Sequence, residues 1–565
     1  MVYDDDQNSP AEEPKRYPLD RDPAPPPKAS LYPVDGRVLD PATALQVRGV
    51  RPRMTVYVGP RLLVSRDDYA ETLDILRDVA RGLGWDVDEE VQTPPKKETQ
   101  AQARQRAQQE RESTGLRFVF RKLRISVTDK RATMAPDAWT LLQQTRAKYG
   151  LARTAGIGLD HVVSPSDGTT WQGNPLWDSN PLWDSNPLWD SNPLWDSNPA
   201  AEGRSAAVAS YARPGQGGRQ PVSYVGPRPS RCTDRELPGR RPVVALLDTG
   251  CAPHPWLQDV VDTGVRLGSL TIGYDDDATN PELQGDLSGP LDGSIDTLSG
   301  HGTFIAGLVH QACPDADILA WRIVPSEGPI VESDLLEALR RVAELVRLHA
   351  EGDKRGRRID VLNLSMGYYH ETPERDDLVD QTMIRILDDL ASHGVLVTCS
   401  AGNDATSRPM YPAAFAPWAN GGGVVRPSGK RVPVVSVGAL NPSRGSDALF
   451  SNAGPWVRVY LPGAAVMSTM PPFQGGFEPI ARTEAFGRTR ESIDPDNFEG
   501  GFAIWSGTSF AAPLLAGVYA ARLRDRLEKP SVKVDDKQAV DRAWEIVKEL
   551  TKIRKTAPRR RGGRG

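Results

Sequence analysis

Residues 243–250 read Val-Val-Ala-Leu-Leu-Asp-Thr-Gly, an unbroken apolar run that ends in an acidic residue, a hydroxyl and a glycine. Strands with such continuous apolar sequence are typical of parallel sheets that are buried on both faces. The same texture recurs downstream, in runs at residues 317–321, 361–364, 395–398 and 432–440. Because these runs alternate with stretches of helical periodicity, we expect an α/β domain with a doubly wound, mostly parallel sheet.

Two helices between these strands are bounded by their end signals. One is expected from about Ser333 to Leu348, with Ser333 or Asp334 as its N-cap. Another begins near Leu378 and should end at Gly394, since glycine is common just past a helix C-terminus. In sheets of this type functional side chains lie at the carboxyl ends of the strands, so the residues that follow each apolar run are candidates for a site.

Three motifs in this region carry reactive side chains. Asp248 ends the first apolar run, His301 opens a helix within Ser-Gly-His-Gly-Thr at 299–303, and Ser509 lies within Ser-Gly-Thr-Ser-Phe-Ala-Ala-Pro at 506–513. A serine hydroxyl becomes nucleophilic when a base takes its proton, and an imidazole is a better base when a carboxylate holds its other N–H. The residue types therefore predict a nucleophilic serine site.

A fourth motif, Ser-Ala-Gly-Asn at 400–403, follows another strand and offers the side-chain amide of Asn403 to an oxyanion. Together, the four motifs resemble those of the subtilisin-like serine proteases (subtilases, peptidase family S8), over about residues 241–523. The resemblance implies that Ser509 is the nucleophile, His301 the general base and then acid, Asp248 the group that orients the imidazole, and Asn403 the oxyanion donor.

The resemblance also assigns two edges that clasp an extended substrate as added strands. These edges are Ser365, Met366 and Gly367 on one side, and Ser400, Ala401 and Gly402 on the other. The glycines at 367 and 402 are expected to leave room for the first side chain before the scissile bond. The implied partner is a protein or peptide substrate.

Residues 51–164 show a different periodicity, with the order β-α-β-β-α-β. The expected elements are a strand at 54–58, a helix with Tyr69, Leu73, Leu76, Ala80 and Leu83 on one face, a strand near 85–88, a polar helical insert to Glu112, a strand at 116–127, a helix with Pro136 in its first turn that ends at Gly150, and a strand at 159–163. This order predicts a small ferredoxin-like domain. Its position suggests a prodomain that inhibits the catalytic domain or assists its folding, and a sensing domain is the alternative.

Between the two domains, Asn-Pro-Leu-Trp-Asp-Ser begins at Asn174, Asn180, Asn186 and Asn192. Such a Pro-punctuated repeat disfavours helix and sheet, so residues 165–239 are expected to be a disordered linker. The tryptophans are either multivalent anchors for a partner or a linker without one. Self-processing is expected in this linker, after Tyr211, Tyr224 or Leu237.

The whole chain has 565 residues and a formal net charge of −5, without the basic excess that announces nucleic-acid binding or an apolar run that spans a bilayer. The N-terminus lacks a signal-like apolar region, which predicts a cytoplasmic location. We expect a disordered segment over residues 1–50, a catalytic domain over 240–527, and a C-terminal helix with a basic tail over 528–565.

No cofactor is predicted. The acidic stretch Asp275–Asp277 with Asp286 is suited to calcium, but its spacing matches no defined loop, so no metal ligand is assigned. The leading hypothesis is a serine endopeptidase that acts through an acyl-enzyme. The alternative is a catalytically silent protein of the same fold, which recruits partners through the Trp repeat.

Overall fold

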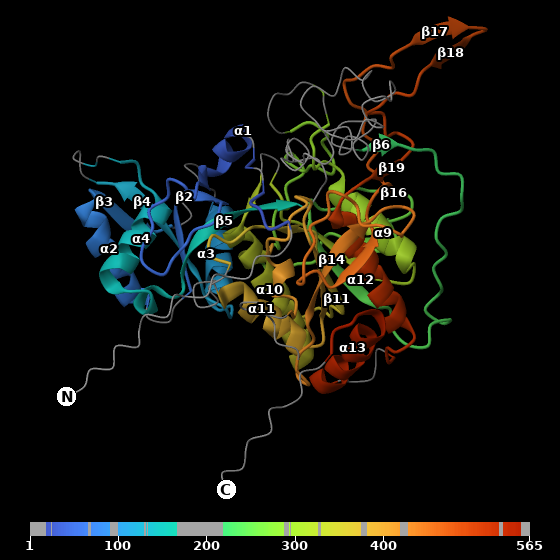
Figure 1. The fold of residues 1–565 in the computed structure, drawn as a ribbon. Coiled ribbons are helices and arrows are strands. Elements are labelled where there is room, and N and C mark those ends of the chain that lie inside the picture. The colour runs from blue at the N-terminus through green and yellow to red at the C-terminus, as the bar shows by residue number, and fades with distance from the viewer. Residues whose placement is uncertain are drawn as a thin grey trace, which may run out of the picture.

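The computed structural model describes residues 19–554, apart from 24, 27, 66–68, 91–99, 129–131, 133, 166–218, 288–292, 294, 326–328, 374–380, 419–427 and 530–534. The Trp repeats and the basic tail predicted from the sequence lie outside the described residues. The described chain forms a smaller N-terminal unit and a larger C-terminal unit that lie side by side (Figure 1).

A parallel sheet forms the centre of the C-terminal unit. Its strands, in order across the sheet, are β15 (Val459–Pro462), β14 (Val434–Leu440), β13 (Leu396–Ser400), β11 (Val361–Leu364), β7 (Val243–Asp248), β9 (Asp317–Arg322) and β8 (Val261–Asp262). Every neighbouring pair is parallel. The central strands are buried along their length, as their continuous apolar sequence predicts.

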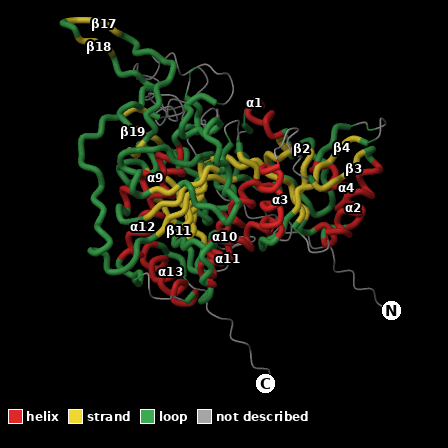
Figure 2. The backbone as a smooth tube through the Cα atoms, turned by 180° about the vertical axis from the view of Figure 1, so that it is seen from behind, coloured by secondary structure: helices red, strands yellow, loops and turns green. Residues whose placement is uncertain are grey.

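Helices cover both faces of this sheet. Figure 2 shows the strands between α9 (His301–Ala312) and α12 (Thr508–Arg524) on one side, and α10 (Glu332–Glu351) and α11 (Gln381–Ser392) on the other. The predicted doubly wound, mostly parallel sheet is therefore confirmed. The last helix, α13 (Asp536–Leu550), packs on α11 and α12, so the C-terminal unit extends beyond the boundary expected at residue 527.

Of the two helix ends predicted for the C-terminal unit, one is confirmed and the other is wrong. Gly394 follows α11 with a φ of +80°, in agreement with its role as a stop. The cap predicted for α10 is wrong: the helix begins at Glu332, its N-cap Val331 makes no side-chain cap bond, and Ser333 lies inside the first turn. Asp160 of the N-terminal unit instead accepts hydrogen bonds of 2.9 Å from the Ser333 N–H and hydroxyl.

The N-terminal unit is an antiparallel sheet in the order β5-β2-β4-β3. Its elements are β2 (Thr55–Val64), α2 (Tyr69–Gly82), β3 (Trp85–Glu89), α3 (Gln100–Thr114), β4 (Arg121–Val127), α4 (Ala138–Tyr149) and β5 (Ile157–Pro165). Helices α2 and α4 pack together over a core that includes Leu62, Leu76, Leu123, Trp139 and Leu142.

Three details of this unit depart from the prediction. The strand β4 begins at Arg121 rather than at 116, and α4 begins after Pro136, with Asp137 as the cap that accepts a 2.9 Å bond from Thr140 N–H. In α2 the residues of the predicted face all contact the core, but the buried face is wider than predicted and also includes Thr72, Ile75 and Val79. Gly150 ends α4 as predicted.

Parts of the two segments expected to be disordered are ordered. Among residues 1–50, α1 (Lys28–Leu31) and the short helix η1 (Tyr32–Val34) precede β1 (Gly36–Leu39), which pairs with β2. At the end of the predicted linker, β6 (Gln220–Pro221) pairs with β19 (Phe502–Trp505). The prediction of disorder, which was made from composition, is wrong for these segments. Pairing with strands of the folded units orders them although they carry little apolar sequence of their own.

A three-stranded sheet, in the order β16-β19-β6, and one hairpin complete the C-terminal unit. Strand β16 (Val466–Thr469) pairs with β19, while β17 (Arg482–Ala485) and β18 (Arg488–Glu491) form a hairpin that projects from the body (Figure 1). The described helices include none that is both long and apolar enough to cross a bilayer.

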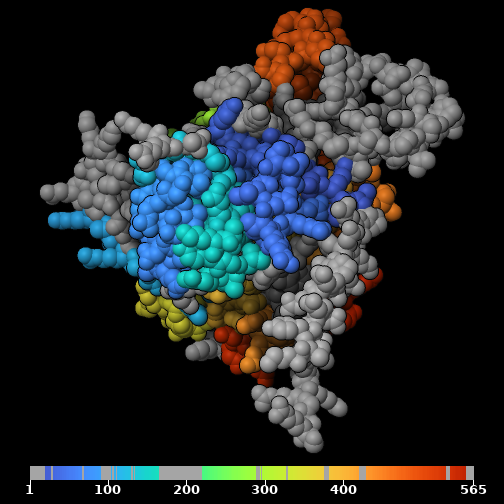
Figure 3. Space-filling view, turned by 60° about the vertical axis from the view of Figure 1, so that its left-hand side comes forward, coloured from blue at the N-terminus to red at the C-terminus, as the bar shows by residue number. Residues whose placement is uncertain are grey.

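The N-terminal unit, blue to cyan in Figure 3, lies against the C-terminal unit through its last strand. Strand β5 pairs antiparallel with β10 (Ile330–Val331) and with β12 (Met366–Gly367), both from the C-terminal unit. The register places Pro165 opposite Met366 and Ser164 opposite Gly367. Sheet pairing therefore crosses the boundary between the units.

Candidate active site

Asp248 and His301 meet at the carboxyl edge of the central sheet. Asp248 is the last residue of β7, and His301 is the first residue of α9. His301 Nδ1 lies 2.7 Å from Asp248 Oδ1, and both side chains are buried. The fold allows this approach because Gly302 has no side chain: a Cβ there would lie 2.0 Å from the carbonyl oxygen of Gly250. The predicted carboxylate–imidazole pair is thus formed.

Ser509 is the second residue of α12, at the helix N-terminus, where backbone N–H groups favour developing negative charge. The ring of the next residue, Phe510, lies tilted against the His301 ring with centroids 5.3 Å apart, which places the start of α12 beside the imidazole. The Ser509 hydroxyl donates to the Ser365 carbonyl at 3.0 Å. In return, the Ser365 hydroxyl donates to the Ser509 carbonyl at 2.9 Å, so these two residues hold each other.

A third motif contacts the residue that precedes Ser509, Thr508. Its backbone N–H donates to Asn403 Oδ1 at 2.9 Å, and its hydroxyl accepts from Gly402 N–H at 3.0 Å. The first bond orients the amide of Asn403, since an amide whose oxygen is engaged presents its NH₂ to the other side. The structure therefore brings Asp248, His301, Ser509 and Asn403 to one edge of the sheet.

Sequence reasoning missed Glu282, a carboxylate that is 1% exposed. It accepts from the Gly302 N–H at 2.9 Å, from the Thr303 N–H at 3.3 Å, and from the hydroxyls of Thr249 and Thr303. Glu282 thus joins the turn after Asp248 to the first turn of the helix that carries His301. Burial raises the pKa of this carboxyl, and the hydrogen bonds from the two threonines oppose the rise. The sequence around Glu282 contains no motif that would have identified it.

The predicted substrate edges lie on either side of the nucleophile, and one of them is already paired. Ser365 precedes β12, and β12 pairs with the end of β5. The other edge, residues 400–402, is buried and begins at the last residue of β13. The side chain of Met410 lies against the glycines of both edges, because a Cβ on Gly367 or Gly402 would meet it within 2.5 Å.

His161 belongs to no motif of the sequence, and in the structure it joins the two units. His161 lies on β5, with Nδ1 2.6 Å from Glu332 Oε2 and Nε2 2.8 Å from Glu371 Oε2. Its ring stacks on Tyr368 at 4.5 Å. Burial would lower the pKa of His161, but Glu332 and Glu371 outweigh it and raise the pKa to about 10.

Among the described residues, one group has ligand atoms close enough to hold a metal ion: His161, His370 and Glu371. The donor set fits a metal poorly. His370 Nδ1 accepts the backbone N–H of Thr372 at 3.0 Å, which leaves the proton on the nitrogen that would have to bind the metal. His161 has both ring nitrogens engaged by carboxylates. These hydrogen bonds argue against a metal ion at this group.

The acidic stretch considered for calcium is engaged by cations of the protein. Asp275 pairs with Arg266, and Asp276 Oδ2 lies 2.8 Å from Arg322 Nη2. Asp286 accepts the Gly293 N–H at 2.7 Å. These contacts engage carboxylate oxygens of Asp275, Asp276 and Asp286 with donors of the protein.

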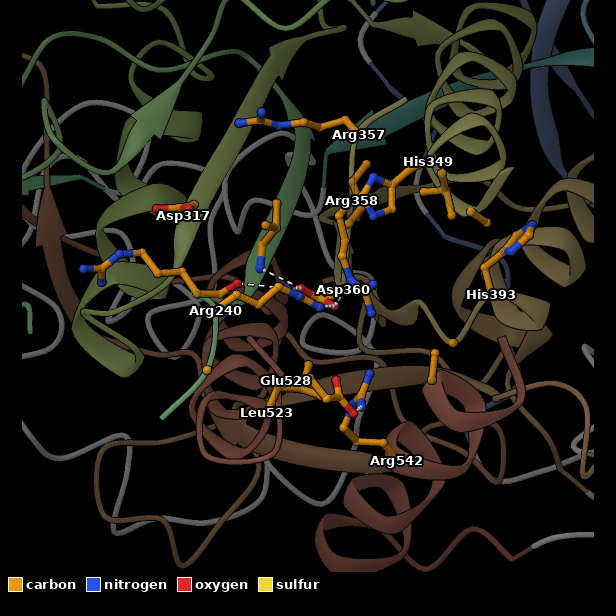
Figure 4. A pocket seen from close by; sticks show the side chains of 18 of the residues that line it. Arg240, Asp317, His349, Arg357, Arg358, Asp360, His393, Leu523, Glu528 and Arg542 are labelled. Carbon is orange, nitrogen blue, oxygen red and sulfur yellow. Dashed lines mark hydrogen bonds and ion pairs between the residues drawn. The ribbon is translucent and has the colours of Figure 1, made fainter. Parts of the chain in front are cut away.

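A cavity of about 1130 Å³ lies at the opposite end of the sheet (Figure 4). It is lined by the amino ends of the parallel strands, near Val243, Asp317 and Asp360, whereas the triad stands at the carboxyl ends. Its charges are largely paired internally: Arg240 holds Asp360 through two bonds of 2.6 Å, and Arg542 holds Glu528 at 2.6 Å. This cavity is separate from the catalytic groups.

Comparison with known proteins agrees with this geometry. The sequence model of the subtilase family of peptidases (S8) matches residues 239–549. An intracellular serine protease of Paenibacillus polymyxa is 25% identical over 297 residues, which cover 50% of this chain and 66% of that protein. Serine protease AprX of Bacillus subtilis (strain 168) is 24% identical over 318 residues, which cover 53% of this chain and 60% of that protein.

Among solved structures, the chain is similar to fervidolysin from Fervidobacterium pennivorans, described as a keratinolytic enzyme related to subtilisin. The similarity covers 88% of this chain and 62% of that one, with 17% identity and a TM-score of 0.41. The chain spans about two-thirds or less of the length of these two protease relatives. The family model covers more than half of the chain, so the resemblance carried by the four motifs is confirmed, and the chain belongs to the subtilase family.

Proposed function

We propose that this protein is a serine endopeptidase that cleaves peptide bonds through Asp248, His301 and Ser509. The observation that carries the proposal is the 2.7 Å contact between His301 Nδ1 and Asp248 Oδ1, beside the helix N-terminus that bears Ser509. A carboxylate on Nδ1 holds the imidazole in the tautomer whose Nε2 accepts a proton. In this arrangement His301 can act as the base that takes the proton of the Ser509 hydroxyl.

The chemistry follows from these positions. The Ser509 hydroxyl turns from the Ser365 carbonyl to His301, gives its proton to Nε2, and its oxygen attacks the carbonyl carbon of the substrate. The Asn403 amide and the Ser509 N–H stabilise the oxyanion. The C–N bond then breaks as His301 returns the proton to the leaving amine. Water, activated by the same imidazole, hydrolyses the acyl-enzyme and restores Ser509.

We further propose that the N-terminal unit is a ferredoxin-like prodomain that inhibits the intact chain. Three contacts of its last strand support this proposal. The end of β5 pairs with the substrate edge at Met366 and Gly367, Asp160 accepts from the N-terminal turn of α10, and His161 lies between two glutamates of the C-terminal unit. An edge paired with β5 cannot pair with a substrate strand.

Self-processing of the chain is proposed directly after β5, in the residues that follow Pro165. The β5 pairing leads the chain along the substrate edge toward Ser509. The bonds after Tyr224 and Leu237, expected from sequence, are less suited: Leu237 is buried, and Tyr224 packs on Trp256 at 4.8 Å. Tyr211 lies outside the described residues.

The test is to compare purified wild type with Ser509→Ala, and with Ser443→Ala as a matched control at an exposed serine. A fluorophosphonate probe should label wild type and the control but not Ser509→Ala. Mass spectrometry should find chain cleavage in the same two proteins only. Equal labelling of Ser509→Ala and wild type would contradict the proposal, whereas no labelling of wild type would favour the catalytically silent alternative.

We also propose a cytoplasmic location, which the name of the Paenibacillus relative, an intracellular protease, supports.

A further inference from the structure

Met410 is the residue whose side chain lies against the glycines of both proposed substrate edges, beside the Tyr411 carbonyl oxygen at Gly367 and the Asn452 amide at Gly402. A Cβ added to Gly367 would lie 2.5 Å from Met410 Cε and 3.0 Å from its Cγ. A Cβ added to Gly402 would lie 2.3 Å from Met410 Sδ. The thioether of Met410 therefore contacts both edges along its length, rather than at its flexible end alone.

The position of Met410 is held by its neighbours. The residue is 4% exposed, and its sulfur lies 3.9 Å from the amide nitrogen of Asn452, which also donates to the Ala401 carbonyl at 2.8 Å. The next residue, Tyr411, exchanges two backbone hydrogen bonds of 2.8 Å with Tyr368, which directly follows β12. Met410 is thus attached to both edges through its side chain and its backbone.

The space that Met410 fills is where the proposed mechanism needs room. A substrate strand that pairs with Met366 and Gly367 reaches Ser365, whose carbonyl is 3.0 Å from the Ser509 hydroxyl. The side chain just before the scissile bond then enters between the two edges. Because Gly367 and Gly402 carry no side chains, the two edges leave room for a substrate side chain between them. Met410 lies at the bottom of this space, against both glycines.

We propose that Met410 determines the specificity of this enzyme, and that the residue before the scissile bond must be small: alanine, serine or glycine. The inference rests on the proposed endopeptidase function and adds the class of peptide. A larger side chain must displace a thioether held between two backbones, and a filled interior does not accommodate extra methylenes without shifts. A single excess methylene in an apolar pocket lowers kcat/KM by about 10–200-fold.

The experiment uses the full chain and two fluorogenic peptides that differ only in alanine or phenylalanine before the scissile bond. The variants are Met410→Ala, which removes the thioether from between the two edges, and Met383→Ala, a matched control at a buried methionine on α11. Fluorophosphonate labelling of each variant reports whether Ser509 remains reactive. Sequencing the new N-terminus of self-processed wild type identifies the residue that precedes the cut.

Wild type should cleave the alanine peptide at least tenfold faster in kcat/KM than the phenylalanine peptide, and its own cut should follow a small residue. Met410→Ala should raise kcat/KM for the phenylalanine peptide at least tenfold, while Met383→Ala keeps the wild-type ratio. Wild type that cleaves the phenylalanine peptide as well as the alanine peptide overturns the inference and leaves the proposed function intact. No cleavage of either peptide together with no labelling of Ser509 refutes the proposed function itself.

Discussion

His161 Nδ1 lies 2.6 Å from Glu332 Oε2, across the boundary between the N-terminal and C-terminal units. Both side chains are almost fully buried, and Glu371 approaches the other ring nitrogen at 2.8 Å. A cation between two carboxylates is stable in such a site only while the imidazole keeps its proton. Docking of the proposed prodomain is therefore coupled to the protonation of one histidine.

This coupling predicts a pH dependence. The ordinary pKa of histidine is about 6.5, and the docked pKa of His161 is raised to about 10, so the contact contributes fully below pH 6.5 and is lost as pH rises toward 10. The slope is at most about 1.4 kcal/mol per pH unit for one proton. Thermal unfolding of the uncleavable Ser509→Ala chain should show stability that falls across this window.

The matched comparison is Ser509→Ala with and without His161→Gln. The glutamine variant should be less stable near pH 7, and the difference between the two proteins should shrink as pH approaches 10. A difference that stays constant from pH 6.5 to 10 would mean that His161 is not the titrating group.

Loss of any triad residue should remove most peptide hydrolysis. Ser509→Ala, His301→Ala and Asp248→Ala each break one step of the same proton transfer, so the double and triple variants should be scarcely worse than the singles. Steady-state kcat/KM on a peptide substrate checks this result. Activity of Ser509→Ala within tenfold of wild type would rule out the proposed mechanism.

Asn403→Ala should lower kcat by roughly 10²–10³-fold, with a much smaller change in KM. The reason is that the Asn403 amide, oriented by Thr508, helps only after charge develops on the carbonyl oxygen. Kinetic parameters measured beside those of Ser443→Ala separate this effect from general loss of folded protein. A rise in KM with unchanged kcat would assign Asn403 to substrate binding instead.

Glu282→Gln should weaken the contact between the turn after Asp248 and the start of α9. A glutamine keeps one acceptor oxygen and turns an NH₂ toward N–H and O–H donors at Gly302 or Thr303, which costs about 1–3 kcal/mol of unfolding free energy. A small displacement of His301 should also lower kcat/KM by about 10- to 100-fold.

The control for this variant is Asp277→Asn, at an exposed carboxyl in the same loop region. Urea unfolding and peptide hydrolysis of both variants should show losses for Glu282→Gln alone. Equal stability of Glu282→Gln and wild type would show that the carboxylate does not hold the two motifs together.

The sequence by itself determined the parallel sheet and the positions of the candidate catalytic residues. The apolar runs before Asp248 and Asn403 predict buried strands, and a strand ending in a functional residue places that residue at the carboxyl edge wherever the strand lies in the sheet. Local signals likewise identified Gly150 and Gly394 as helix ends, because the backbone freedom of glycine acts at its own position.

Tertiary structure alone decided which residues lie beside these groups. Gly367 and Gly402 show in the sequence only that their own side chains are absent, and the atoms that a Cβ there would meet come from Met410, Tyr411 and Asn452. Glu282 and His161 carry no local signal either, since their partners lie on other elements. A residue's own size and propensity are local properties, whereas burial, pairing and pKa depend on the neighbours that folding brings within a few ångströms.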